Sequence, residues 1–382
     1  MNILVYFENP ISPMNGGTER ATYNVIQELQ KVGYRIFTLS KHSATGQNWV
    51  LPNVNLLHSE NISFVNSLLS DNKIDVIINE GGNTSDVQLF NHYTLTTDAR
   101  IITCLHFCTL QGFGDHYYSD LPYVKSQKDI IRILKMPYTR KKALSLFRKN
   151  YTMALEYGDA FVVLDDAFKI ELSKFLGTHI FDEKIHTIPN MNSFVCDRSV
   201  PLSEKENRIL YVGRLQYKTK RIDRLLKACK KLGSLLDTWH VDIVGDGPDR
   251  GYYESLAQTL GLKNITFHGT QSPESFYTKA KIIALTSTHE SFGMTLIEGM
   301  AFGCVPIAFD SYSSVRSIIE NERNGFLVKP FSIDAYAAAL AKIMTDVSLQ
   351  KQIVANSKET LRKFHPKTVS ALWEKLLGGG EN

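Results

Sequence analysis

The sequence predicts an α/β protein made of two doubly wound domains, each built on a parallel sheet. Short runs rich in β-branched residues alternate with stretches of helical spacing along the 382-residue chain. One polar segment near the middle interrupts this alternation. The length independently favours two domains over one.

The first domain is predicted over residues 1–190. Two stretches with helical spacing, 18–32 and 166–176, lie between runs that are typical of buried strands. The predicted strands are 2–7, 35–40, 73–79, 100–107, 159–165 and 184–190.

Residues 191–206 lose the pattern and are predicted to be a linker, and the second domain is predicted over 207–364. Its predicted strands are 207–215, 240–247, 264–269, 281–287 and 305–310. Residues 365–382 are expected to form a C-terminal helix, with Pro366 in its first turn, that packs back on the first domain. Two such domains imply a cleft, and ligands of open α/β sheets bind beyond the carboxyl ends of the strands.

Composition limits the class of protein. Hydrophobic residues make up 43% and charged residues 21%, and the net charge of +4 gives no indication of nucleic-acid binding. The amino-terminal residues lack the pattern of a signal peptide, and no apolar run reaches the ~18 residues of a membrane span. A cytoplasmic location with reduced thiols is expected. The five cysteines complete no zinc-ligand spacing: Cys104, Cys108, Cys196, Cys229 and Cys304.

A glycine pair follows the first predicted strand in "GGTER". Gly16 and Gly17 stand before a helix, where backbone amides can approach a phosphate closely. The alternative is a tight turn with Thr18 as N-cap. The stretch contains no G-x-G-x-x-G and therefore does not predict a dinucleotide site.

Basic residues follow the strand at 207–215. Arg214 precedes Lys220 and Arg221, which stand where the next helix should begin, and such cations suit a diphosphate. A solvated basic loop is the alternative. Gly245, in the turn "VGDGPDR", is expected to have a mainly architectural role that helps to shape the pocket for the base.

The segment "HESFGMTLIEGMAFG" places a glutamate on either side of a helix start. If the helix begins near Gly293, the amides of Gly293, Met294 and Thr295 form an anion site. Glu298 then lies about 7.5 Å further along the axis, and Glu290 lies on the approach loop. The order of these groups is carboxylate, backbone amides, carboxylate. A nucleotide sugar has matching groups in the same order: sugar hydroxyls, pyrophosphate and ribose. The alternative is that the two acids lie in the first turns of a surface helix only because the helix dipole favours negative charge there.

Taken together, these motifs resemble those of the retaining glycosyltransferases of family four. "GGTER", "VGRL…KRID", "GDGP", "HESFGMTLIEGMAFGCVPIA" and "NGFLV" occur in the order and at the separations of that family, over nearly the whole chain. The resemblance implies the GT-B fold, in which two Rossmann-like domains face each other across a cleft.

The resemblance also implies roles for individual residues. Glu290 would hold hydroxyls of the donor sugar, and Glu298 the ribose. Arg214 and Lys220 would neutralise the leaving diphosphate, with Gly17 closing over it from the first domain.

Further implied positions lie around the sugar. His106 would lie near the reacting sugar, with a structural histidine as the alternative. Ser291 stands where the family often has Gly, and the interval from Arg214 to Lys220 is one residue longer than in many members, so Arg221 could share the role of Lys220.

The implied chemistry is retaining and needs neither a metal nor a cofactor. Its main demand is stabilisation of charge on the leaving diphosphate, and a phosphate oxygen of the donor can accept the proton of the incoming hydroxyl. "LDD" at 164–166 opens a helix, so its acids are expected to be caps and not metal ligands.

Residues 124–150 carry nine Lys or Arg and one Asp among apolar side chains. This composition predicts a patch, including Arg140, Lys141 and Lys142, that contacts the anionic inner surface of a membrane or an acceptor. A solvated basic face is the alternative. Tyr117 and Tyr118, in the preceding aromatic loop, could stack against acceptor sugars.

The resemblance therefore implies transfer of a sugar from a nucleotide-sugar donor to an acceptor. The family, together with the basic segment, favours a saccharide or lipid-linked saccharide of a surface polysaccharide or lipopolysaccharide as that acceptor. The family also favours a UDP-sugar as donor, with a GDP-sugar next. A nucleotide-sugar epimerase of the same fold and a non-catalytic sugar-nucleotide-binding protein are the alternatives. A Rossmann oxidoreductase is disfavoured by the missing G-x-G-x-x-G.

Overall fold

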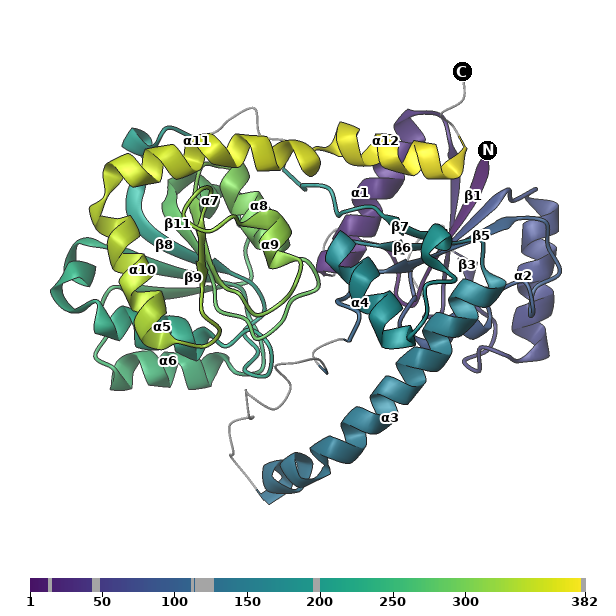
Figure 1. Cartoon of the computed structure of the whole chain (residues 1–382), viewed down its shortest axis with the longest axis horizontal. Coiled ribbons are helices and arrows are strands. Elements are labelled where there is room, and N and C mark those ends of the chain that lie inside the picture. Colours follow the sequence, from purple (N-terminus) through teal and green to yellow (C-terminus); the bar gives the residue numbers. More distant parts are fainter. Residues whose placement is uncertain (13–15, 43–48, 111–112, 114–126, 195–199, 379–382) are drawn as a thin grey trace. The chain divides into compact units, whose positions relative to one another are not determined.

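The computed structural model of the chain describes residues 1–12, 16–42, 49–110, 113, 127–194 and 200–378. These residues form two α/β units, each organised around one parallel sheet (Figure 1). The first unit comprises residues 1–110, 137–193 and 365–382, and the second comprises 111–136 and 194–364. The α/β class predicted from the alternation of strands and helices is confirmed.

The sheet of the first unit has the strand order β3-β2-β1-β4-β5-β6-β7, and every pair is parallel. The strands are β1 (Asn2–Phe7), β2 (Arg35–Ser40), β3 (Trp49–Val50), β4 (Val76–Asn79), β5 (Arg100–Leu105), β6 (Ala160–Val163) and β7 (Ile185–Thr187). β4 begins three residues later than predicted, after the left-handed turn at Lys73 (φ +47°). The strand order reverses between β1 and β4, which makes this the switch point where such sheets bind ligands.

Helices cover both faces of this sheet, which is why its strands are continuously apolar. On one face α1 and α12 bury Leu29 and Trp373 against Val5 and Ile78, and α2 covers the other face. The helices are α1 (Gly17–Lys31), α2 (Ser59–Asp71), α3 (Gln127–Tyr157), which begins in the second unit, α4 (Asp166–Leu176) and α12 (Pro366–Leu377), with 3₁₀ turns η1 (Ser85–Gln88) and η2 (Asp182–Lys184).

The helix starts of this unit test three local predictions. Gly16 is the N-cap of α1, so the interpretation of Thr18 as N-cap is wrong. The Asp165 side chain accepts a 2.8 Å hydrogen bond from the amide of Ala167 and caps α4, as predicted for "LDD". Pro366 occupies the first turn of α12, as predicted.

The second sheet has the order β10-β9-β8-β11-β12-β13 and is also parallel throughout. Its strands are β8 (Glu206–Val212), β9 (His240–Val244), β10 (Ile265–Gly269), β11 (Ala280–Leu285), β12 (Val305–Phe309) and β13 (Phe326–Val328). Here the order reverses between β8 and β11. The loops after these two strands are therefore neighbours, although they are far apart in the sequence.

Two groups of helices cover this second sheet. α5, α6 and α10 form the main core against one face, α7 and α8 pack on the other, and α11 contacts both α10 and α8 (Figure 1). The helices are α5 (Ile222–Lys231), α6 (Arg250–Thr259), α7 (Glu274–Lys279), α8 (Met294–Ala301), α9 (Val315–Ile318), α10 (Ile333–Thr345) and α11 (Val347–Lys363), with 3₁₀ turns η3 (Leu202–Glu204) and η4 (Gly233–Thr238).

The segment predicted to be a linker carries side chains that are built into the units. Met191 belongs to the core of the first unit, whereas the Phe194 ring packs edge-on against Phe302 of the second. The buried ammonium of Lys205 donates to the carbonyls of Tyr277 and Ala280 at 2.7 and 2.9 Å. These contacts anchor both ends of the segment.

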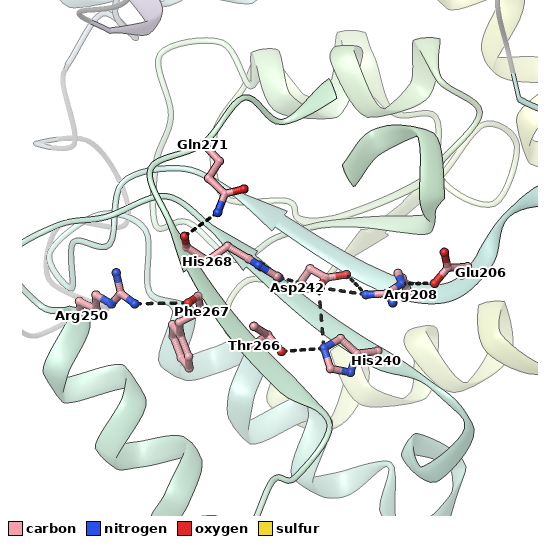
Figure 2. Close-up of polar contacts among 9 residues, drawn as sticks. All are labelled: Glu206, Arg208, His240, Asp242, Arg250, Thr266, Phe267, His268 and Gln271. Carbon is pink, nitrogen blue, oxygen red and sulfur yellow. Dashed lines mark hydrogen bonds and ion pairs between the residues drawn. The ribbon is translucent and has the colours of Figure 1, made fainter. Parts of the chain in front are cut away.

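One face of β8, β9 and β10 carries a charged network in place of an apolar surface (Figure 2). The buried carboxylate of Asp242 accepts hydrogen bonds from Arg208 at 3.0 Å and from Nε2 of His268 at 2.8 Å. Nε2 of His240 lies 3.7 Å from the same carboxylate and 2.9 Å from the hydroxyl of Thr266. Burial, together with the charge of Arg208, lowers the pKa of His240 below its ordinary value of 6.5, although the carboxylate of Asp242 opposes this shift.

This lowered pKa predicts a loss of stability in mild acid. The folded chain favours neutral His240, so below pH 6.5 the unfolded chain binds the proton more readily and the free energy of unfolding falls as the pH decreases. Urea unfolding of the wild type and of His240→Gln at pH 7.5 and 5.5 measures this. The variant should lose less stability between the two pH values than the wild type, and an equal loss would contradict the prediction.

Candidate active site

The loop between β8 and α5 carries the basic residues that the sequence analysis singled out. Arg214 is exposed and Lys220 is half-buried. Arg221 is the N-cap of α5 with a left-handed backbone (φ +48°). Its guanidinium donates to the carboxylate of Asp223 at 2.9 Å and lies 4.4 Å over the ring of Tyr217. Arg221 is thus engaged in a buried pair within the turn itself.

Asp223 stabilises the turn at Arg221 through ion pairs with Arg221 and Lys227. Its side chain is fully buried, and burial alone would raise its pKa. The hydrogen bond and charge of Arg221, together with the charge of Lys227, outweigh burial and lower the pKa of Asp223 overall. A carboxylate kept ionised in the interior depends on these cations. The conformation of the turn that presents Lys220 is therefore tied to this pair.

Lys220 and Glu290 meet in the second unit. The Lys220 ammonium lies 2.6 and 2.7 Å from the two carboxylate oxygens of Glu290, and the Ser287 hydroxyl donates to the same carboxylate at 2.5 Å. The side chains of Lys220 and Glu290 retain only 25% and 11% of their exposure, so solvent screens this pair less than a surface pair. The structure brings these two predicted residues together.

Backbone contacts between the two loops hold this pair in place. The amide of Thr288 donates to the carbonyl of Thr219 at 2.8 Å, and the hydroxyl of Thr286 donates to the carbonyl of Lys220 at 3.3 Å. Beneath them, the buried Arg224 donates to the carbonyl of Thr286 at 3.2 Å. The two loops can make these contacts because they follow β8 and β11, which are adjacent where the strand order reverses.

α8 begins where the sequence predicted. Gly293 is its N-cap, and a β-carbon there would lie 2.6 Å from the hydroxyl oxygen of Tyr312 in a backbone with φ +96°, so only glycine fits. Met294 and Thr295, the first helical residues, are half-buried. The first amides of a helix have no partners within the helix, so this end of α8 can accept an anion.

Glu298 lies in a different environment from Glu290. It is fully buried in α8, and its carboxylate accepts a 2.8 Å hydrogen bond from the hydroxyl of Tyr277. A ribose can reach this carboxylate only if neighbouring side chains move. The role predicted for Glu298 stays a prediction.

Gly245 lies against the loop that carries Arg214. Its backbone has φ +131°, and a β-carbon would lie 2.0 Å from the carbonyl oxygen of Gly213. The amide of Gly213 in turn donates to the carbonyl of Val244 at 3.0 Å. The loop after β9 therefore supports the loop after β8 at the residue before Arg214.

In the first unit, Gly16 and Gly17 open α1 after β1, and His106 follows β5. Both His106 and Glu80, which follows the neighbouring strand β4, are buried, and Nε2 of His106 hydrogen-bonds the carboxylate of Glu80. Nδ1 of His106 has no hydrogen-bond partner among the described residues. One ring nitrogen of His106 is therefore bonded to Glu80, and the other is left without a partner among the described residues.

The basic segment forms most of α3. Lys141 and Lys142 are exposed, and Arg140 is half-buried with a partner. Tyr117 and Tyr118 lie outside the described residues.

Sequence reasoning missed several residues that contact the predicted ones. The missed hydrogen-bond partners are Glu80 for His106, Asp223 for Arg221, Ser287 for Glu290 and Tyr277 for Glu298. Only Asp223 and Ser287 had an accessible signal, because each lies within three residues of its partner. The other two pairings depend on strand order and helix packing.

Residues 196–360 match the family described as glycosyl transferases group 1. An N-acetylgalactosaminyltransferase of Campylobacter jejuni that acts on a diphospho-undecaprenol-linked saccharide is 26% identical over 64% of this chain and 66% of its own length. A lipopolysaccharide 1,6-galactosyltransferase of Salmonella typhimurium is 27% identical over 62% of this chain and 69% of its own. The first relative is thus matched over slightly less than two thirds of its length.

Solved structures extend the likeness to the whole chain. The apo form of the lipopolysaccharide outer core galactosyltransferase WaaB superposes with a TM-score of 0.72 at 18% identity and covers 100% of both chains. Anabaena HepE in complex with UDP and glucose gives 0.73 at 16% identity and covers 99% of both.

The two Rossmann-like units and these neighbours define a GT-B fold, as the resemblance implied. The match to the glycosyl transferases group 1 family covers residues 196–360, which lie largely in the second unit. The placement of the two units relative to each other, and hence the cleft, stays a prediction.

The contact at Gly245 predicts that Gly245→Ala is destabilising, because the new methyl group collides with the Gly213 carbonyl in a backbone that favours glycine. The free energy of unfolding should fall by at least about 2 kcal/mol. Urea titration measures it. In the control Gly251→Ala, no atom lies within 4 Å of the new methyl group, and stability should hold or rise slightly. Equal stability of the two variants would contradict the assigned contact.

Proposed function

We propose that this protein is a retaining glycosyltransferase that moves a sugar from a nucleotide-sugar donor to a saccharide or lipid-linked acceptor in surface polysaccharide or lipopolysaccharide synthesis. A UDP-sugar is the favoured donor and a GDP-sugar the next. The observation that carries the proposal is the meeting of Lys220 and Glu290 beside the start of α8. The names of the relatives support the class of reaction.

Binding of the donor is proposed to exchange the partners of this pair. Without donor, Lys220 and Glu290 neutralise each other. A diphosphate at the amides of Met294 and Thr295 offers Lys220 a more highly charged partner. Glu290, once released, can accept hydrogen bonds from the hydroxyls of the donor sugar.

The same groups account for the chemistry. As the sugar–phosphate bond breaks, negative charge grows on the diphosphate, and Lys220, Arg214 and the α8 amides stabilise it. An oxygen of the leaving phosphate accepts the proton of the acceptor hydroxyl, which attacks from the same face, so the configuration is retained. We propose that no metal or cofactor takes part, because these cations and amides are the groups that neutralise the diphosphate.

A nucleotide-sugar epimerase or a non-catalytic binding protein remains the alternative function. Turnover of UDP-glucose and GDP-mannose with and without a saccharide acceptor separates them. Acceptor-dependent release of nucleoside diphosphate supports the transferase, whereas conversion without acceptor supports the epimerase. A thermal-shift panel of UDP-, GDP- and ADP-sugars identifies the donor class, since a ligand raises apparent stability according to its affinity.

Partner exchange makes a specific prediction for Glu290→Gln. Removing this charge frees Lys220 from competition, so UDP should bind about fivefold more tightly, corresponding to ~1 kcal/mol for a partly shielded pair. Turnover of the nucleotide sugar should fall at least tenfold, because the contact to the sugar hydroxyls is weakened. Calorimetry and product release measure the two effects.

The matched variant is Lys220→Met, which should weaken UDP binding and turnover together. Weaker UDP binding in Glu290→Gln would contradict the exchange of partners.

We propose that α3 brings the enzyme to an anionic membrane surface on the cytoplasmic side, where a lipid-linked acceptor would be found. Its exposed apolar side chains Ile130, Ile131, Leu134 and Tyr138 recur at spacings that place them on one face of the helix. Lysines and arginines flank this face. No helix in the described part of the chain is long and apolar enough to cross a bilayer, so contact at the surface is what is proposed.

This surface predicts binding to vesicles. The wild type should sediment with phosphatidylglycerol-containing vesicles and not with purely zwitterionic ones, and added salt should weaken the binding. The double variant Leu134→Ser/Tyr138→Ser should bind severalfold less, whereas Ile180→Ser, at a residue with 79% exposure outside α3, should bind like the wild type. Equal sedimentation of all three proteins would exclude α3 as the contact.

A further inference from the structure

The loop between β12 and α9 reaches the start of α8. The hydroxyl of Ser311 donates to the carbonyl of Ser287 at 2.9 Å, which joins this loop to the one that carries Glu290. The next residue, Tyr312, places its hydroxyl directly against Gly293, the N-cap of α8. No motif in the sequence pointed to Tyr312.

The hydroxyl of Tyr312 has no hydrogen-bond partner among the described residues, although the residue is only 8% exposed. A buried polar group without a partner destabilises the fold, and such groups are uncommon. Among the other buried tyrosines of this unit, the Tyr336 hydroxyl donates to the carbonyl of Ile307 at 3.1 Å, whereas the hydroxyl of Tyr253 in α6 also has no partner among the described residues. Tyr312 differs from Tyr253 in its place, because its open hydroxyl lies against the N-cap of α8, where a ligand could supply the partner.

The surroundings define the chemistry of that ligand. Burial, and then the nearby negative charge of Glu290, raise the pKa of Tyr312 well above its usual value, so its hydroxyl stays protonated and can donate. It lies beside the end of α8 where the amides favour an anion. A protonated phenol and unpaired amides share one preferred partner, an anionic oxygen.

We propose that Tyr312 is a donor-binding residue whose hydroxyl donates a hydrogen bond to a phosphoryl oxygen of the nucleotide-sugar diphosphate. The inference rests on the proposed function, since it places a diphosphate at α8. It adds a contact from a third loop to those from the Lys220 and Glu290 loops. The hydroxyl that destabilises the ligand-free fold then stabilises the complex.

Tyr312→Phe tests this assignment because it removes only the hydroxyl. Calorimetry should show UDP, or GDP if the wild type prefers it, binding at least tenfold more weakly to the variant, as expected for a lost hydrogen bond to a charged group. The Tm of the ligand-free variant should be equal to or higher than that of the wild type. A residue that only supported the fold would show a lower Tm instead. Tyr253→Phe, at a fully buried tyrosine of α6, is the matched control and should bind like the wild type.

The outcomes separate this inference from the proposed function. If the wild type binds nucleoside diphosphate and Tyr312→Phe binds it equally well, the assignment of Tyr312 is overturned and the proposed function stands. If only the intact nucleotide sugar binds more weakly, the hydroxyl contacts the sugar and the phosphoryl assignment is overturned. If the wild type binds no nucleoside diphosphate, both are overturned.

Discussion

The ion pair between Lys220 and Glu290 is the interaction on which the rest of the site depends. The two residues are 70 positions apart and come together because β8 and β11 are neighbours where the strand order of the second sheet reverses. Hydrogen bonds from Thr286 and Thr288 to the Lys220 loop fix the approach. Opposite charges held at this distance and partly shielded from water stabilise the two loops. In the proposed function, the same two groups exchange partners when the donor binds.

The surrounding residues show how the fold accommodates a site of this kind. Asp223 keeps an ionised carboxylate in the interior to hold the turn at Arg221, and Gly245 and Gly293 allow contacts that a β-carbon would forbid. The unpaired hydroxyl of Tyr312 is a further cost to stability. Two of these features, the glycine N-cap Gly293 and the unpaired hydroxyl of Tyr312, meet at the start of α8, as expected where the fold is organised for a ligand.

Much of the fold could be predicted from the sequence because buried parallel strands are continuously apolar. β3, with two residues, is too short for any periodic signal. The start of α8 could be predicted from the sequence. Lys220 and Glu290 could be singled out because they are charged residues that follow strands, and their roles stay predictions. The pairing of His106 with Glu80 and the burial of Glu298 were not, because both depend on tertiary packing. The contact between the Tyr312 hydroxyl and Gly293 could not be predicted either, because it depends on how the loop after β12 packs against the start of α8.

The most direct test is a crystal structure of the protein with bound UDP or GDP. The diphosphate should lie at the amides of Met294 and Thr295, with the ammonium of Lys220 moved from the Glu290 carboxylate to a phosphoryl oxygen. A nucleotide bound away from α8, or a diphosphate at α8 with the Lys220–Glu290 pair intact, would contradict this prediction.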